Sequence, residues 1–285
     1  MRALVLSGGG SKGAFQVGAI SHLLGELELT YDIFTGISVG ALNGAHLAMY
    51  PAGSELLSVN HLVDVWNSIS DTKVFTSRYP GLGSTLSLIL SALSTKSLYS
   101  TAPLRSLVQK LLLPDKLLTS GKLLSVGAVS LNSGEVRYWN QDSSDIVQAV
   151  LASSAFPGFF EPVDIDGDVW TDGGVRDIAP IQRAMDLGAT EVDVVITSPV
   201  GLSRIDAGGR TVVGIAKRIV DAMSEEIVET DVLLGKELAE EEGITVRILR
   251  PSVVIQSNSL DFSQEKIQEN IQHGLQQARK VDWHG

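Results

Sequence analysis

The most constraining feature of the sequence is a Gly-x-Ser-x-Gly box, Gly36 to Gly40, which closes a short apolar run at residues 33–34. A serine in such a box lies on a tight turn from a strand into a helix, and a side chain at either glycine would collide with neighbouring backbone. The turn exposes the Ser38 hydroxyl at the N-terminus of the next helix, where the helix dipole favours developing negative charge. Ser38 is therefore the candidate nucleophile.

A second glycine-rich loop lies upstream. Residues 3–6 are a continuous apolar run that ends in Ser7-Gly8-Gly9-Gly10, the pattern of a buried parallel strand followed by a turn. Residues 13–27 and 39–49 are predicted to be helices. The chain therefore begins with two strand-loop-helix units, and each loop lies at the carboxyl end of a strand, where active sites of open α/β sheets usually lie.

The rest of the chain continues to alternate strands and helices. We predict a three-layer α/β/α fold with a mostly parallel central sheet, formed by one domain over residues 1–285, because neither an internal repeat nor a low-complexity linker is visible. The further strands are expected near residues 123–129, 135–139, 170–171, 192–197 and 244–249, and the further helices near residues 146–154, 180–187, 215–242 and 263–280.

Composition excludes several classes of function. The formal net charge of −11 argues against a nucleic-acid partner and against strong attraction to anionic membranes. The absence of cysteine excludes disulfides, thiolate metal sites and a cysteine nucleophile. Met1-Arg2 runs directly into the first strand, and no apolar run approaches membrane-spanning length. We therefore expect a cytoplasmic protein, with peripheral contact at membranes left open and its oligomeric state not predicted.

Asp172 is the candidate base for Ser38. It ends the predicted strand at residues 170–171, and Gly173 and Gly174 let the chain turn so that the carboxylate faces the same sheet edge as Ser38. A partly buried carboxylate with few charged neighbours has a raised pKa, which makes it a better base. An Asp-capped turn without catalytic meaning is the alternative.

Histidine is the more usual base in serine hydrolases. His46 lies about 12 Å along the helix that follows Ser38, which is too far to take its proton. Only His273 follows Asp172 in the chain order Ser, Asp, His of conventional α/β-hydrolases. A triad with His273 therefore remains an alternative, although a lone histidine on an amphipathic helix is usually structural.

The loop from Gly8 to Gly13 allows two functional interpretations. It satisfies the Gly-x-Gly-x-x-Gly pattern of dinucleotide-binding oxidoreductases, but no acidic residue closes the second strand, since Asp32 precedes it. A phosphate-binding P-loop is excluded because Lys12 is followed by glycine. In a hydrolase, the N–H groups near Gly9 and Gly10 would instead form an oxyanion hole.

Taken together, these motifs resemble the patatin-like phospholipase family over most of the chain. The matching blocks are Gly8-Gly9-Gly10-Ser11-Lys12-Gly13, Gly36-Ile37-Ser38-Val39-Gly40, Ala152-Ser153-Ser154-Ala155-Phe156-Pro157 with Phe160-Glu161-Pro162-Val163, and Asp172-Gly173-Gly174. The sequence departs from the family at Lys12, where arginine is common, and at Ile178, where many bacterial members carry asparagine.

The resemblance implies a lipid acyl hydrolase with a Ser38–Asp172 dyad and an acyl-enzyme intermediate. It implies an oxyanion hole at Gly8, Gly9, Gly10 and Ser11, supported by Lys12, Gly36, Gly40, Gly173 and Gly174. It implies no metal and no cofactor. The expected substrates are phospholipids, lysophospholipids or acylglycerols, reached through transient contact with a membrane or micelle surface. A silent lipid-binding module is the alternative outside enzymes.

Two further segments have functional interpretations. Residues 82–93 carry no charge and place leucines on one helical face, so they predict either a core helix or a cap that docks on lipid aggregates, within a helical cap insertion at residues 70–120. Residues 164–168 resemble the start of a calcium loop, but the required later glutamate is missing, and a hairpin turn at Asp166-Gly167 explains them.

Overall fold

The computed structural model describes residues 1–77, 97–201, 212–255 and 258–283. Within these residues, eight strands form one mixed sheet: β1 (Arg2–Leu6), β2 (Ile33–Gly36), β5 (Leu123–Ser130), β6 (Val136–Asn140), β7 (Val163–Ile165), β8 (Asp168–Asp172), β9 (Glu191–Val195) and β10 (Thr245–Leu249). The strand order is β10-β9-β1-β2-β5-β8-β7, and β6 pairs with β5. The five strands from β10 to β5 are mutually parallel, as the sequence predicted.

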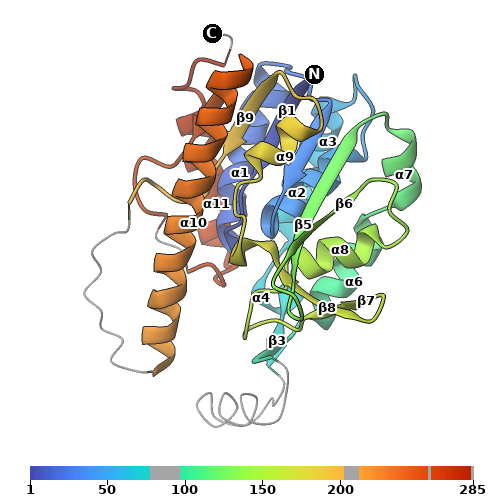
Figure 1. Ribbon diagram of the computed structural model, residues 1–285, viewed down its shortest axis with the longest axis vertical. Coiled ribbons are helices and arrows are strands. Elements are labelled where there is room, and N and C mark those ends of the chain that lie inside the picture. Colours follow the sequence, from blue (N-terminus) through green and yellow to red (C-terminus); the bar gives the residue numbers. More distant parts are fainter. Residues whose placement is uncertain (78–96, 202–211, 256–257, 284–285) are drawn as a thin grey trace.

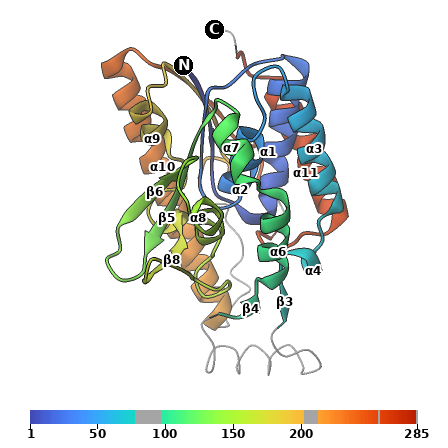
Figure 2. The ribbon, with the colours of Figure 1, turned by 90° about the vertical axis from the view of Figure 1, so that its right-hand side faces the viewer.

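Helices cover both faces of this sheet (Figures 1 and 2). One face is packed by α1 (Gly13–Ile20), α2 (Val39–Ala48), α3 (Glu55–Ser68), α8 (Ile146–Ser153) and α11 (Gln264–Ala278), and the other by α9 (Ile181–Asp186) and α10 (Val212–Glu242). In β1, Leu4 and Leu6 belong to the first core, and Ala3 and Val5 to the second. Because β1 is buried on both faces, its sequence is continuously apolar. The predicted three-layer α/β/α fold is confirmed.

The strand that ends in Asp172 runs against the parallel strands. The first half of β5 pairs with β2, which ends with Gly36 opposite Val126, and the second half pairs with β8, which ends with Asp172 opposite Ala128. β2 is parallel to β5 and β8 is antiparallel to it, so the carboxyl ends of β2 and β8 meet end to end beside Gly127. The sequence predicted that Asp172 ends a strand near Ser38, but nothing in it indicated that this strand is antiparallel to β5.

Two local features differ in detail from the sequence prediction. The helix predicted over residues 13–27 is α1 followed by a π-helical segment, Ser21–Glu26. The strand predicted at residues 170–171 is longer and pairs with β7 through a turn in which Asp166 and Gly167 have φ of 55° and 80°. Both residues are left-handed, as a type I′ hairpin turn requires, which agrees with the turn predicted there.

The described part of residues 70–120 consists of short elements beside the sheet. These are α4 (Asp71–Val74), the antiparallel pair of β3 (Thr76–Ser77) and β4 (Tyr99–Ser100), α6 (Ala102–Leu111) and α7 (Pro114–Thr119). The uncharged segment at residues 82–93 lies outside the described residues. Among the helices that are described, none combines the length and apolar character needed to cross a bilayer.

Candidate active site

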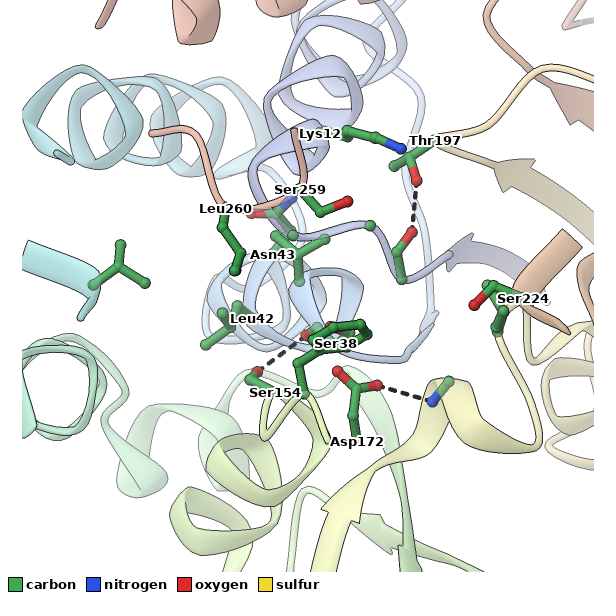
Figure 3. Close-up of a pocket in the computed structure, with 18 of the residues that line it drawn as sticks. Lys12, Ser38, Leu42, Asn43, Ser154, Asp172, Thr197, Ser224, Ser259 and Leu260 are labelled. Carbon is green, nitrogen blue, oxygen red and sulfur yellow. Dashed lines mark hydrogen bonds between the residues drawn. The ribbon is translucent and has the colours of Figure 1, made fainter. Parts of the chain in front are cut away.

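Ser38 lies on a strained turn between β2 and α2. Its backbone angles, φ 57° and ψ −125°, are ones that residues other than glycine rarely adopt. A Cβ on Gly36 would lie 2.4 Å from the carbonyl oxygen of Gly40, and one on Gly40 would lie 2.1 Å from the carbonyl oxygen of Leu6. The close approach of three backbone segments therefore requires both glycines. The turn presents Ser38 to a cavity (Figure 3).

Asp172 is buried at the end of β8, and its carboxylate lies beside Ser38 (Figure 3). Its Oδ1 accepts a hydrogen bond of 2.8 Å from the Gly174 N–H. Burial raises the pKa of Asp172 from 3.8 to about 7, and hydrogen bonds from the Ser38 hydroxyl and the Gly174 N–H lower it in part. The carboxylate is therefore a stronger base than an exposed aspartate.

The turns that follow β2 and β8 fit together over Gly127. A Cβ on Gly127 would lie 2.6 Å from the side chain of Ile37, and a Cβ on Gly173 would lie 2.6 Å from the Gly127 carbonyl oxygen. Side chains at these two positions would push the turns apart. The end-to-end meeting of β2 and β8 therefore brings Ser38 and Asp172 together.

Two serines at the end of α8 bind the backbone of Ser38. The Ser153 Oγ accepts a hydrogen bond of 2.9 Å from the Ser38 N–H, and the Ser154 hydroxyl donates one of 3.3 Å to the Ser38 carbonyl oxygen. The Ser153 bond satisfies the Ser38 N–H, while the Ser38 carbonyl oxygen also accepts hydrogen bonds from the N–H groups of Ala41 at 3.0 Å and Leu42 at 3.3 Å. The sequence identified this segment only through the family resemblance. The only local signal was the pair of adjacent hydroxyls, four and three residues before Pro157.

Two of the four residues predicted for an oxyanion hole have their N–H groups bound within the protein. The Gly8 N–H donates to the Ile178 carbonyl oxygen at 3.1 Å, and the Ser11 N–H donates to the Ser259 carbonyl oxygen at 2.9 Å. Gly8 and Ser11 thus tie the glycine-rich loop to its neighbours.

The other two, Gly9 and Gly10, have N–H groups that donate to no protein acceptor among the described residues. Their φ angles are 155° and 60°. A Cβ on Gly9 would lie 2.2 Å from the Thr197 Oγ1, and one on Gly10 would lie 2.1 Å from the Ser259 carbonyl oxygen. Only glycine fits at either position. Of the four predicted donors, the N–H groups of Gly9 and Gly10 are therefore the two that are left to bind an anion.

A cavity of about 780 Å³ opens beside Ser38 and Asp172. It extends between α2, α3 and α6, and the side chains that line it there are mostly apolar. They include Leu42, Ala45, Met49, Leu62, Val65, Trp66, Leu104, Leu107, Val108 and Leu111. Lys12, Thr197, Ser224 and Asn258 line a more polar part. The cavity therefore joins Ser38 to an apolar channel and to a polar region.

Neither histidine considered from the sequence lies at Ser38 as a base. His273 packs its ring edge-on against Phe15, with ring centres 5.3 Å apart, and its Nε2 lies 3.3 Å from the Gln277 Nε2. His46 lines the cavity but donates through Nε2 to the Ser58 carbonyl oxygen at 3.2 Å, and burial lowers its pKa to about 4. His46 is therefore neutral at physiological pH. Of the candidate bases considered from the sequence, Asp172 is the one that lies beside Ser38.

Replacing His273 by alanine is expected to leave ester hydrolysis within about tenfold of wild type, because a side chain outside the site changes only local packing. The measurement is kcat/KM for a soluble p-nitrophenyl ester, together with the melting temperature. A loss of several orders of magnitude at an unchanged melting temperature would restore the triad with His273.

Two other kinds of site were considered from the sequence, a metal site and a dinucleotide-binding site. Among the described residues, no group of three histidines or carboxylates could hold a metal ion. In the dinucleotide alternative, an acidic residue at the carboxyl end of β2 would bind a ribose. In the structure that end is formed by Gly36 and the Ser38 turn, so the position of the ribose-binding acid is not occupied by an acidic residue.

Comparison with known proteins identifies the family. The family model described as patatin-like phospholipase matches residues 4–185, and the chain belongs to this family. The matched region contains Ser38, Asp172 and the glycine-rich loop. Residues beyond it add β9, α10, β10 and α11.

Two solved structures are similar to the chain at low identity. VipD from Legionella pneumophila is 17% identical with a TM-score of 0.46, and the match covers 98% of this chain and 66% of that one. The heterodimeric ExoU–SpcU complex from the type III secretion system of Pseudomonas aeruginosa is 16% identical with a TM-score of 0.30, and the match covers 99% of this chain and 52% of that one. This chain thus spans only part of the length of either.

Proposed function

We propose that the protein is a serine acyl hydrolase that cleaves fatty-acyl ester bonds of phospholipids, lysophospholipids or acylglycerols, using Ser38 as nucleophile and Asp172 as base. The observation that carries this proposal is the buried carboxylate of Asp172 beside a serine on a strained turn, at the opening of an apolar cavity. Membership of the patatin-like phospholipase family supports the substrate class. The active unit is residues 1–285 as one domain, and no cofactor takes part.

The reaction proceeds in two halves. Asp172 accepts the proton of the Ser38 hydroxyl while Oγ attacks the ester carbonyl carbon, and the N–H groups of Gly9 and Gly10 stabilise the oxyanion. Collapse breaks the bond to the alcohol, which leaves with the proton from Asp172, and the fatty acyl group stays on Ser38. Asp172 then takes a proton from water, the resulting hydroxide attacks the acyl-enzyme, and the fatty acid is released as Ser38 regains its proton.

A fluorophosphonate probe tests this assignment. Its phosphorus reacts with an activated serine and leaves a tetrahedral adduct that uses the same oxyanion donors. We expect wild type and Ser224→Ala to be labelled, because Ser224 lines the cavity apart from Ser38 and Asp172 (Figure 3), and Ser38→Ala to stay unlabelled. Labelling of Ser38→Ala at the wild-type rate would place the nucleophile elsewhere.

The apolar part of the cavity predicts a preference for long acyl chains. Leu42, Ala45 and Met49 face the cavity from one side of α2, and at 1.5 Å per residue Ala45 and Met49 lie about 10 Å and about 16 Å beyond Ser38. An acyl chain bonded to Ser38 would run along this helix. Contact with apolar walls over that length favours long chains over short ones.

Two substitutions test the path of the acyl chain in opposite directions. Ala45→Phe is expected to lower kcat/KM for p-nitrophenyl palmitate by about tenfold or more while sparing the butyrate ester, since it fills the cavity midway. Met49→Ala enlarges the far end and should leave both esters active. An equal loss on both esters in Ala45→Phe, with the fold intact, would contradict this path.

The raised pKa of Asp172 predicts an acid limb in the pH profile. Because the base must be ionised, and burial raises its pKa to about 7, kcat/KM should fall about tenfold for each pH unit below that value. The expected midpoint is therefore near neutrality, where an exposed aspartate would give one near 4. A profile that is flat from pH 5 to pH 8 for the soluble butyrate ester would exclude Asp172 as the base.

Transient contact with a membrane or micelle surface is part of the proposal, because long-chain lipids reach an enzyme from aggregates. We propose that residues 70–120 form a cap beside the cavity. Of this segment, α6 lines the cavity with Leu104, Leu107, Val108 and Leu111. We propose a cytoplasmic location with peripheral membrane contact, and the net charge of −11 means that this contact would rest on apolar side chains and not on attraction to anionic lipids.

A further inference from the structure

The segment between Asp172 and α9 contacts both halves of the proposed site. At its start, the Gly174 N–H binds the Asp172 carboxylate at 2.8 Å. In its middle, the carbonyl oxygen of Ile178 accepts the Gly8 N–H at 3.1 Å. The Ile178 side chain also lies 3.9 Å from the position that a Cβ on Gly8 would take. Ile178 is therefore one of the contacts that hold the glycine-rich loop, with its two oxyanion donors, relative to the nucleophile; another is the Thr197 hydroxyl, which donates to the Gly8 carbonyl oxygen at 2.6 Å.

Asp231 on α10 holds the backbone of this segment. Its Oδ2 accepts hydrogen bonds from the N–H groups of Ile178 at 2.8 Å and of Ala179 at 2.9 Å. The side chains of Ile178 and Ala179 are apolar, so neither residue supplies an acceptor for these N–H groups itself. Hydrogen bonds to an ionised carboxylate are about twice as strong as those between neutral groups. One side chain of a distant helix therefore fixes both N–H groups.

Asp177 is a second buried carboxylate, close enough to Asp231 that their negative charges repel each other. Asp177 accepts a hydrogen bond from the Tyr138 hydroxyl, and its buried Oδ1 has no hydrogen-bond partner among the described residues. Burial and the charge of Asp231 raise the pKa of Asp177. Burial also raises the pKa of Asp231, but the two N–H donors oppose that shift. Asp231 is thus the carboxylate stabilised as an anion, while Asp177 is the one that binds a proton more readily.

We propose that Asp231 is a positioning residue for ester hydrolysis, which holds the Ile178 carbonyl against Gly8 and thereby aligns the oxyanion donors with Ser38. This inference rests on the proposed function. Asp231 is not among the residues that line the cavity, so it makes no contact that would set the affinity for substrate. Its loss should therefore lower kcat and leave KM unchanged.

The test compares three variants on the soluble butyrate ester, with active sites counted by fluorophosphonate titration. Asp231→Ala removes the acceptor, and kcat per active site is expected to fall about 10- to 100-fold with KM within twofold, because a misplacement of about 1 Å has effects of this size. Asp231→Asn keeps an oxygen that accepts both N–H bonds and should stay within about threefold of wild type. Glu240→Ala, an exposed change on the same helix, is the control.

The possible results separate this inference from the proposed function. If wild type hydrolyses the ester and Asp231→Ala matches it in kcat, or changes KM alone, Asp231 does not position the loop. An Asp231→Asn variant as impaired as Asp231→Ala also overturns the inference. If wild type neither hydrolyses the ester nor reacts with the probe, the proposed function itself fails.

A measurement on wild type covers the case in which Asp231→Ala does not fold. Amide hydrogen exchange at Ile178 and Ala179 should be slow, with protection close to that of neighbouring α9, because both N–H groups are held by a carboxylate. Exchange as fast as in an exposed loop would overturn the inference without any variant.

Discussion

Replacing Ser38 by alanine or Asp172 by asparagine is expected to abolish ester hydrolysis, with kcat reduced by about 10⁴-fold or more in each variant. Alanine removes the atom that forms the acyl-enzyme. Asparagine keeps the shape of Asp172 but does not accept the serine proton. Because the two residues act as one unit, the double variant should be little worse than either single variant. The measurement is turnover of a soluble p-nitrophenyl ester and of phospholipid vesicles.

The stability of Asp172→Asn separates loss of the base from loss of the fold. Burial raises the pKa of Asp172 from 3.8 to about 7, so the native state binds this proton more tightly than the unfolded state does. Wild type therefore loses stability as pH rises from about 4 to about 7, by up to about 4 kcal/mol at 1.36 kcal/mol per pKa unit. Asparagine has no charge to bury.

The inactive Asp172→Asn variant should consequently melt at a higher temperature than wild type at pH 8, and the difference should shrink as pH falls toward 5. Near-normal turnover of the soluble ester by this variant would show that Asp172 is not the base. An inactive variant that melts below wild type at both pH values would point to structural damage instead.

Replacing Gly10 by valine is the second change with a large expected effect. The new Cβ would lie 2.1 Å from the Ser259 carbonyl oxygen at a φ of 60°, so the loop must move and its N–H donors with it. Loss of one oxyanion donor costs about 10²- to 10³-fold in kcat. We expect a loss of that size for the soluble ester with a much smaller change in KM. Gly9→Val, which would meet Thr197, should behave in the same way.

A matched control separates this effect from the general strain of valine at positive φ. Gly121 has a φ of 77° and no neighbouring atom within 4 Å of an added Cβ. Gly121→Val therefore carries the backbone strain without the contact, and it should keep wild-type kcat. If Gly10→Val is folded and equally active, the oxyanion donors lie elsewhere in the site.

The fold could be predicted from sequence because its signals are local. The apolar runs at β1 and β2, each ended by glycines, determine two strand-loop-helix units, and the box around Ser38 predicts a turn that the structure contains. Asp172 was predicted at a strand end beside Ser38, where the structure has it. The strands, turns and helices needed only residues close together in the chain, whereas the pairing of Asp172 with Ser38 rested on a shared sheet edge and on the family resemblance.

The rest depends on contacts between distant residues, which one sequence does not reveal. Ser153 and Asp231 bind backbone groups far from them in the chain, and any exposed serine or aspartate would look the same in sequence. Gly8 and Ser11 were predicted as oxyanion donors, but their N–H groups are bound to carbonyl oxygens of distant segments. Nothing local distinguishes these two from Gly9 and Gly10.

The end-to-end meeting of β2 and β8 on β5 has a consequence for how such a protein can change. The distance between Ser38 and Asp172 is set by where β2 and β8 end on β5, opposite Val126 and Ala128. As long as these strand pairings hold, the loops between the two residues can lengthen or shorten at little thermodynamic cost. New segments can thus be inserted there to alter which lipids enter while the reaction centre is inherited intact. A one-residue slip of β8, by contrast, would turn the Asp172 side chain to the other face of the sheet.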